Sequence, residues 1–164
     1  MENIPVTAYS GFSNVRGEIT LRKVIENITK GIHAKLIFKI RLLVSQRKME
    51  EANNVKKQLP FYTVTAGYRE KRQAYSITRY THIILLDIDD QPEEKLEGLR
   101  EKINGDPNTL ASFLTPKAHG FKIFVFMRTK YATTLRESLA KTGMDFPTLE
   151  KHHRMMYDAC KEYY

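Results

Sequence analysis

Two aspartates at the end of the most apolar segment carry the clearest chemical signal in the chain. The run Leu85-Leu86-Asp87-Ile88-Asp89-Asp90 places Asp87 and Asp89 two residues apart in a predicted strand, so both carboxylates lie on one face. Paired carboxylates can bind one or two divalent cations, and two cations about 3.5–4 Å apart are the usual device of phosphoryl and nucleotidyl transfer. The competing interpretation is structural: Asp89 or Asp90 caps the next helix while Asp87 pairs with an arginine. The motif alone leaves both interpretations open.

The connection over residues 115–122, Thr-Pro-Lys-Ala-His-Gly-Phe-Lys, is the second candidate. Small residues, an imidazole and two lysines can bind a phosphate, although Gly and Pro in a hairpin loop most often only shape the turn. Lys122 falls within the following predicted strand, on the same face as Phe124 and Phe126. It is either an edge lysine whose amine reaches solvent or a cation held for an anion, and its distance from the aspartates decides between the two.

A basic segment with interspersed tyrosines is the third candidate, and it contains Arg69, Lys71, Arg72 and Arg79. Cationic side chains contact phosphates and tyrosines stack on unpaired bases, so single-stranded nucleic acid is a reasonable ligand. The alternative is a solvated loop whose tyrosines point inward. Six basic residues of the predicted N-terminal helices are interpreted as ordinary helix surface: Lys35, Lys39, Arg47, Lys48, Lys56 and Lys57.

Charge and composition narrow the class of protein. The 164 residues include 27 Lys and Arg against 19 Asp and Glu, a net charge of +8 that favours a polyanionic partner. Residues 1–80 hold 15 basic and 6 acidic side chains, whereas residues 81–164 hold 12 and 13. The single Cys160, with no signal or membrane-spanning segment, indicates a cytoplasmic protein that does not use a membrane. The sequence lacks the glycine-rich loop of NTPases, the Rossmann motif of oxidoreductases and the nucleophile elbow of α/β-hydrolases. These three enzyme classes therefore lose their usual motif support.

Apolar periodicity predicts the elements that must position these residues. The predicted helices cover about residues 21–30, 33–44, 46–59, 92–103, 131–142 and 148–164, with Gly31 and Gly143 as stops for two of them. The predicted strands cover about residues 6–12, 61–65, 81–89, 110–114 and 121–128. The strand over 81–89 is apolar on both faces, so we expect it in the centre of a sheet.

This order of elements indicates an α+β fold, with a mixed or antiparallel sheet covered mainly on one face by helices. We expect a single domain over residues 1–164, the N-terminal part of a longer protein. Its N-terminal helical part covers about residues 18–59, the sheet core about 60–130 and the C-terminal helices about 131–164. The histidines show no spacing of metal ligands and are interpreted as structural or surface residues.

The motifs together resemble those of the VirE-type N-terminal domain. The similarity lies in the strand with Leu-Asp-Ile-Asp-Asp, the Phe-Leu-Thr-Pro strand end, the Gly-Phe-Lys that follows, and an upstream stretch over residues 59–67 with Arg72. That family is in turn similar to the archaeo-eukaryotic primase (primase-polymerase) superfamily, which implies an RRM-like core. By this resemblance Asp87 and Asp89 hold catalytic Mg²⁺ or Mn²⁺ and Lys122 is catalytic. The same resemblance implies nucleotide-phosphate contacts from Lys117, His119, Gly120 and Lys122.

Two departures from the family pattern matter. The usual Ser-Pro-Ser-Gly-x-Gly-Leu-Lys has Lys117 in place of the second Ser and Ala118 in place of the first Gly. A third acidic residue is expected in a strand beyond the last helix, and Tyr164 is reached before such a strand, so either the chain is truncated or the active site is incomplete.

We therefore expect a primase-polymerase-like nucleotidyltransferase domain of mobile-element DNA replication. It would bind single-stranded or primer-template DNA, a nucleotide, and a helicase-like domain of the same or another chain. The alternative is a non-catalytic module of the same fold that docks nucleic acid or a helicase. A third hypothesis is a partner-binding domain with no role in nucleic-acid binding.

Overall fold

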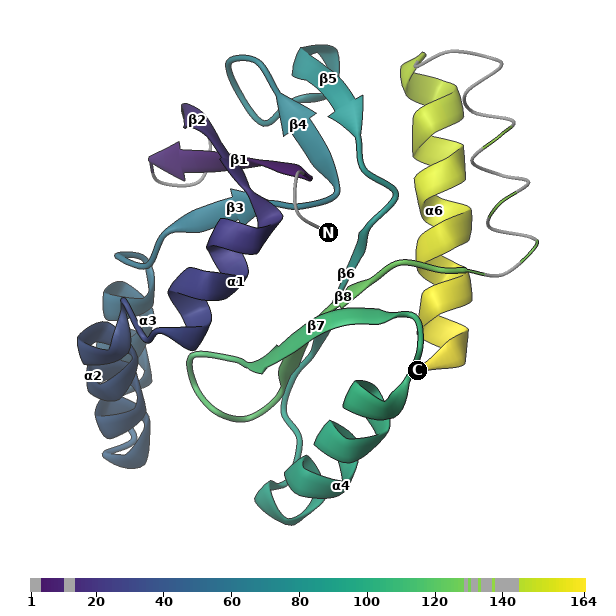
Figure 1. The fold of residues 1–164 in the computed structure, drawn as a ribbon. Helices are drawn as coiled ribbons and strands as arrows, with labels where there is room; N and C mark the ends of the chain where they lie inside the picture. The colour runs from purple at the N-terminus through teal and green to yellow at the C-terminus, as the bar shows by residue number, and fades with distance from the viewer. Residues whose placement is uncertain (1–3, 11–13, 129, 131–132, 134–136, 138–144) are drawn as a thin grey trace.

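The computed structural model describes residues 4–10, 14–128, 130, 133, 137 and 145–164, and Figure 1 shows the arrangement of their elements. The eight strands within these residues are β1 (Pro5–Ser10), β2 (Asn14–Thr20), β3 (Phe61–Thr63), β4 (Ala66–Tyr68), β5 (Ile77–Tyr80), β6 (Ile84–Ile88), β7 (Thr109–Leu114) and β8 (Phe121–Val125). The helices are α1 (Leu21–Thr29), α2 (Ala34–Ser45), α3 (Met49–Lys56), α4 (Glu93–Gly105) and α6 (Phe146–Tyr163), with a 3₁₀ turn over Ala74–Ser76.

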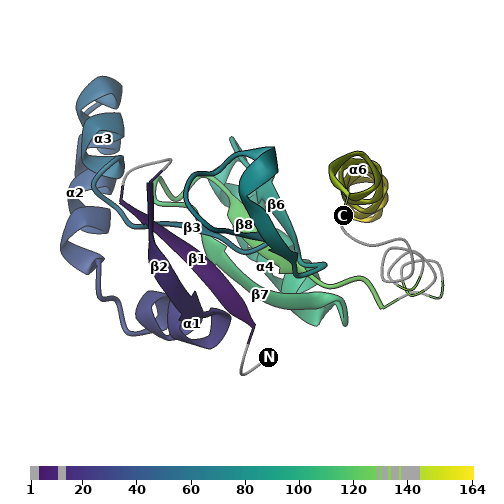
Figure 2. The same cartoon turned by 90° about the horizontal axis from the view of Figure 1, so that it is seen from above.

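The strands form three antiparallel sheets, which confirms the predicted α+β fold. Their orders are β2-β1-β3, β4-β5 and β6-β8-β7. Seen from above, α2 and α3 lie at one end of the molecule and α6 lies at the other, with the strands between them (Figure 2). The candidate site lies on the third sheet.

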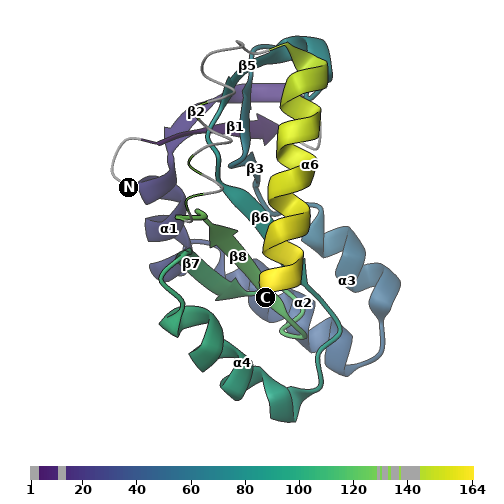
Figure 3. The same cartoon turned by 90° about the vertical axis from the view of Figure 1, so that its right-hand side faces the viewer.

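One face of the β6-β8-β7 sheet is sealed by α4 and α6. Ile84 and Leu86 of β6 and Ile123 of β8 join Ile103 of α4 and Met156 of α6 in one buried cluster. Figure 3 shows α6 running in front of this sheet, with α4 across its lower end. The two-residue period of the strands assigns alternate side chains to this dry face and to its opposite.

The opposite face packs against the N-terminal part of the chain. Leu85, Phe113 and Phe124 contact a cluster that includes Leu21 and Val24 of α1. Helices α2 and α3 form a hairpin with a small core of their own: Ile40, Leu43, Ala52 and Val55. The third sheet is thus covered by helices on one face and by α1 and the first sheet on the other.

Local signals account for several helix ends. The Thr20 hydroxyl accepts a hydrogen bond from the Lys23 amide and caps α1, and Gly31 beyond its end adopts a left-handed φ of 63°. Pro92 precedes the acidic first turn of α4. The Asp145 carboxylate accepts from the Thr148 amide, so α6 begins at Phe146, two residues before its predicted start.

Several sequence expectations require correction. Strand β8 is central and β6 is an edge strand, because β6 forms its ladder with β8 alone within the described residues. The apolar character of β6 reflects packing on both of its faces. Strands β2 and β5 were not predicted. The strand predicted over 61–65 ends at Thr63, and Gly67 lies within the separate strand β4, where the Arg79 guanidinium packs over it.

Two further findings concern the predicted helices. The helix over about 131–142 and its stop at Gly143 fall largely outside the described residues. Across the described residues, the helices are all too short or too polar to cross a bilayer.

Candidate functional site

A cross-strand ion pair is the centre of the candidate site. In the β6–β8 ladder Asp87 lies directly opposite Lys122, and the Lys122 Nζ donates to the Asp87 Oδ2. The Asp87 side chain is 43% exposed and that of Lys122 is 25% exposed, so the pair is reached by solvent. Lys122 therefore forms an ion pair within the protein rather than extending freely into solvent, and its role toward a ligand anion stays a prediction.

The helix-cap interpretation of the aspartates is wrong. Helix α4 has Pro92 as its N-cap, and that cap makes no side-chain hydrogen bond. Asp89 is exposed one residue past the end of β6, where its carbonyl accepts from the Gln91 side-chain amide. Asp90 adopts a left-handed φ of 53°, which turns the chain sharply after the strand. Only Asp87 is placed by the strand ladder, and its partner is Lys122 rather than an arginine.

The loop over residues 115–120 is held tightly against the end of β6. A Cβ on Gly120 would lie 1.8 Å from the Ile88 carbonyl oxygen, so only glycine fits there without a backbone shift. The Gln91 amide donates to the His119 carbonyl, and the Thr115 amide donates to the Gly120 carbonyl. The loop and the aspartate turn therefore form one rigid unit, with the His119 side chain exposed and that of Lys117 half-buried.

Ala118 occupies the position at which the family pattern has its first glycine. Its φ is 63°, in the left-handed region, and its amide donates to the Thr115 carbonyl. A Cβ in this conformation costs about 1 kcal/mol relative to glycine. The backbone thus adopts the conformation that favours glycine despite the altered sequence.

A groove of about 930 Å³ opens beside the ion pair. One wall is the face of the third sheet that bears Lys122, with Leu85, Phe113 and Phe124, and Pro116 of the loop lies at its edge. The other wall comes from α1, the α2–α3 hairpin and the segment that leads into β3. Figure 1 shows the β7–β8 connection extending toward these helices. The groove therefore joins the N-terminal helices to the candidate site.

The groove is apolar within and basic around it. Its cationic lining side chains are Arg41 of α2, Lys56 and Lys57 at the end of α3, and Lys122, and His33 also contributes. None of the described residues that line it is acidic. A potential of one sign focused in a cleft attracts anions, so the groove suits an anionic ligand with an apolar or aromatic part.

Divalent-cation binding at the aspartates would need ligands beyond those that the described residues bring together. Within the described part of the chain, no group of three or more His, Cys, Asp or Glu side chains could hold a metal ion. Asp87 and Asp89 provide hard oxygen donors, but Lys122 already engages one oxygen of Asp87. Mg²⁺ commonly binds through one or two carboxylates plus substrate phosphates and water, so this donor set fits a cation that arrives with a phosphate.

Some side chains of the basic segment are exposed to solvent, and one is held in an ion pair within the fold. Arg69 and Lys71 are exposed, and Arg72 lies with its guanidinium carbon 4.9 Å from the centre of the Phe61 ring. Arg79 instead forms an ion pair of 2.7 Å with Glu18 and covers Gly67. Arg79 is therefore held as a structural link between β5 and β2, and three of the four predicted contacts remain available to a ligand.

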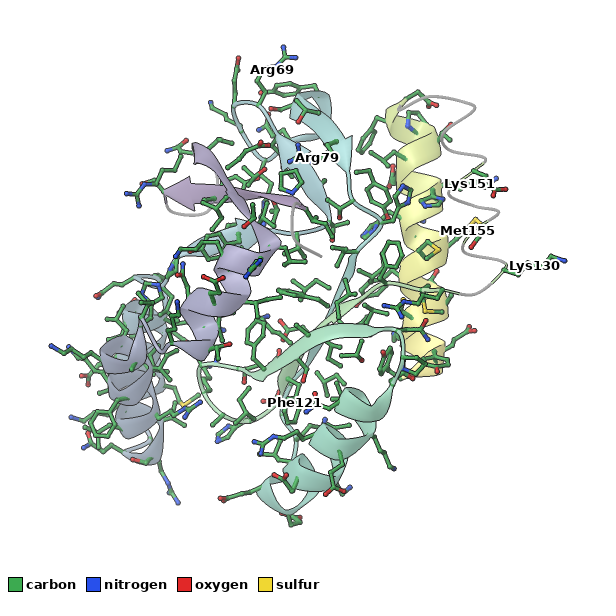
Figure 4. All side chains as sticks on the ribbon, in the orientation of Figure 1. Arg69, Arg79, Phe121, Lys130, Lys151 and Met155 are labelled. Carbon is green, nitrogen blue, oxygen red and sulfur yellow. The ribbon has the colours of Figure 1, made fainter. Side chains whose placement is uncertain are left out.

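The tyrosines of this segment mostly point inward, as the alternative interpretation expects. Tyr80 is buried and Tyr68 is half-buried with its ring 6.4 Å from that of Tyr9, whereas Tyr75 is 74% exposed. The hollow beside Arg69 and Tyr75 has a volume of about 160 Å³, well below that of the groove. Figure 4 places Arg69 at the upper end of the molecule and Phe121, the neighbour of Lys122, in its lower half. The structure does not bring the basic segment and the ion pair together.

A histidine cluster lies where β5 meets α6 and serves structure. The His82 Nδ1 lies 3.3 Å from the His152 Nε2, and the Tyr80 hydroxyl lies 3.1 Å from the His153 Nδ1. Burial raises the pKa of Tyr80 and lowers the pKa of His153, so both side chains are neutral near pH 7. Buried Cys160 has its pKa raised to about 11 by desolvation and is not a reactive thiolate.

The groove residues of the helical hairpin were missed from the sequence. Arg41 was not among the candidate residues, and Lys56 and Lys57 were interpreted as ordinary helix surface. One signal could have drawn attention to Arg41: from Asn27 to Met49 the chain has six Lys and Arg residues and no acidic one, whereas Lys56 and Lys57 lie beyond this run, after Glu50 and Glu51. An amphipathic helix surface normally mixes charges, so an acid-free run of this length indicates an anion-facing surface.

Comparison with known proteins identifies one family. The family model described as "BT4734-like, N-terminal domain" matches residues 54–164, which cover both the ion pair and the basic segment. The chain therefore belongs to the BT4734-like N-terminal domain family. No curated protein and no solved structure matches the chain.

Proposed function

We propose that this member of the BT4734-like N-terminal domain family is a primase-polymerase-like domain of mobile-element DNA replication. In this proposal the β6–β8 face binds a nucleotide together with Mg²⁺ or Mn²⁺, and the domain also binds DNA. The VirE-type resemblance of the motifs supports the assignment to replication. The buried lone thiol of Cys160 is compatible with a reducing, cytoplasmic compartment.

The observation that carries the proposal is the pairing of Asp87 with Lys122 beside the groove. The two motifs that the resemblance makes functional lie 35 residues apart in the chain, yet their polar side chains meet on one sheet face. In a purely structural role a solvent-exposed ion pair contributes only about 0–1 kcal/mol. A nucleotide phosphate would compete with the Asp87 carboxylate for the Lys122 ammonium, because both groups are anions. The carboxylate would then be free to bind a divalent cation.

Each residue of the candidate site has a separate role in this proposal. Asp87, with Asp89 just beyond the strand, would hold the divalent cation, which neutralises charge on the phosphates when bound. Lys122 and the loop residues Lys117, His119 and Gly120 would orient the phosphates, with Gly120 allowing the close approach of the loop to β6. Phe113 and Phe124 would form the apolar wall of the groove beside the phosphates.

Isothermal titration of the chain with dATP, with and without Mg²⁺, tests this proposal. We expect binding that depends on Mg²⁺ and falls at least about tenfold in Asp87→Asn, which is about 1.4 kcal/mol. Asp158→Asn is the matched control, because Asp158 is an exposed carboxylate on α6 and its loss should change nothing. Absence of dATP binding, or equal binding by Asp87→Asn, would contradict the proposal.

A second candidate function is a non-catalytic module that docks nucleic acid or a helicase-like partner. Two observations favour it: the Asp87 carboxylate is already neutralised by Lys122, and the described residues offer no third metal ligand. Template-dependent incorporation of labelled nucleotide with Mn²⁺ separates the two functions. Incorporation that Asp87→Asn abolishes identifies the enzyme, whereas nucleic-acid binding without incorporation identifies the module.

A further inference from the structure

We infer that the groove between the α2–α3 hairpin and the β6-β8-β7 sheet binds single-stranded nucleic acid. The inference rests on the proposed function, because it names the ligand that lies beside the nucleotide site. It differs from the sequence expectation, which assigned this contact to the segment with Arg69, Lys71 and Arg72.

Charge complementarity is the first argument. Arg41, Lys56 and Lys57 approach the groove from α2 and α3, Lys122 approaches from the sheet, and the described residues that line it include no acid. Arg41, Lys56 and Lys57 are exposed at their helix surfaces, so a ligand reaches them without rearrangement. Besides Lys122, which pairs with Asp87, three cations lie along one wall of the cleft, and they match several phosphates of a strand rather than a single small anion.

The chemistry of the groove interior is the second argument. Tyr62 and Phe113 line it while remaining only half-buried, and Phe124 packs edge-on against Phe113 with ring centres 5.6 Å apart. Unpaired bases stack on aromatic side chains, which duplex DNA cannot do because its bases are already stacked. An apolar interior between basic edges therefore favours single strands over duplex.

Size and continuity provide the third argument. The volume of about 930 Å³ lies at the upper end of the range of about 300–1,000 Å³ for small-molecule sites and far above the hollow of about 160 Å³ near Arg69. Phe61 of the groove also carries the Arg72 guanidinium on its ring, 4.9 Å away. A strand that leaves the groove past Phe61 would thus meet the basic segment next, and the segment would serve as an extension of the site.

Fluorescence anisotropy with a labelled oligothymidine of about 12 nucleotides tests the inference across a salt series. The variant is Lys56→Ala with Lys57→Ala, and the matched control is Lys95→Ala with Lys102→Ala on α4, which removes the same charge from exposed positions outside the groove. We expect the groove variant to weaken binding about tenfold and to reduce the slope of log affinity against log salt by about 1.4, since each phosphate contact on a single strand contributes about 0.7. The control should keep both values.

A second variant tests stacking. Phe113→Leu keeps an apolar side chain but removes the ring, so we expect affinity for the single strand to fall about 5- to 150-fold with an unchanged salt slope. The same protein should show an unchanged affinity for a duplex of equal length, and its thermal melting shows that it remains folded.

Distinct results would overturn the inference. If the Lys56/Lys57 variant matches its control while Arg69→Ala with Lys71→Ala and Arg72→Ala loses binding, the strand binds the basic segment and not the groove. Equal competition by polyglutamate would indicate a general anion site or an acidic partner protein, and absence of oligothymidine binding at low salt would reject the inference altogether. Failure of the proposed function is separate: it is a loss of Mg²⁺-dependent dATP binding while oligothymidine still binds in the groove.

Discussion

The two faces of the β6-β8-β7 sheet, built from alternate residues of the same strands, differ sharply in chemistry. Ile84, Leu86 and Ile123 point to the face that α4 and α6 seal, and each is at most 5% exposed. Asp87 and Lys122 point to the other face and remain open to solvent. The sealed face is lined by apolar side chains of β6 and β8, whereas the other face combines Leu85 and Phe124, which pack against the α1 cluster, with polar groups that contribute little to stability and are available for binding.

This difference determines which positions tolerate substitution without loss of stability. A fully buried side chain contributes by removing apolar area from water and by close packing, so nearly any change at such a site destabilises the fold. An exposed ion pair can change partners at small cost. Substitutions on the sealed face should therefore lower the free energy of unfolding. Substitutions of Asp87 and Lys122 on the other face should mainly change ligand affinity.

The largest expected effect is on the sealed face. Ile123→Ala removes a side chain that is 0% exposed and leaves a cavity among β6, α4 and α6, so we expect a loss of about 2–5 kcal/mol in the free energy of unfolding. Lys122→Ala, at the neighbouring position on the opposite face, should cost at most about 1 kcal/mol. Urea unfolding measures both, and equal losses would mean that the two faces do not differ as described.

A smaller effect is expected where the two faces meet at the end of β6. Gly120→Ala places a Cβ against the Ile88 carbonyl oxygen, so the loop or the strand must shift, and we expect a loss of about 1–3 kcal/mol. Gly98→Ala in α4 is the matched control, because its Cβ meets nothing within 4 Å and alanine favours the helix by about 0.5–1 kcal/mol. A Gly120→Ala protein as stable as the wild type would show that the loop is not held against β6.

The smallest effect is expected from the ion pair itself. A double-mutant cycle with Asp87→Asn and Lys122→Met isolates the coupling between the two side chains, and we expect a value below about 1 kcal/mol because both are solvated. The same single variants should change dATP affinity far more than they change unfolding. A coupling of several kcal/mol would instead make the pair a structural element of the sheet.

Particular residues show how far the sequence could be followed. The helical spacing of Leu21, Val24, Ile25 and Ile28 predicted α1, and Pro92 with two glutamates predicted the start of α4, because these signals act within one turn of chain. Strands β2 and β5 escaped prediction because each mixes a few apolar residues with exposed polar ones over a short span, so that pairing with β1 and β4 defines them. The same applies to β6, whose two apolar faces predicted a central strand although its only described ladder is with β8.

The candidate site likewise contains residues that the sequence could identify and residues that it could not. Asp87 and Lys122 could be selected as candidate residues from their types and motifs, and the acid-free run around Arg41 was a local signal. Lys56 and Lys57 could not be selected, since nothing local distinguishes a lysine that faces a groove from one that faces bulk solvent.

The sequence by itself determined the α+β class, the position of most helices and the residues with chemical potential, because periodicity, capping and residue type are properties of short segments. Only the tertiary structure decided that Asp87 meets Lys122, that Arg79 is held by Glu18 and that the α2–α3 hairpin closes a groove beside them. Each of these is a contact between segments far apart in the chain, and such contacts are selected by how whole apolar faces pack together rather than by the residues that meet.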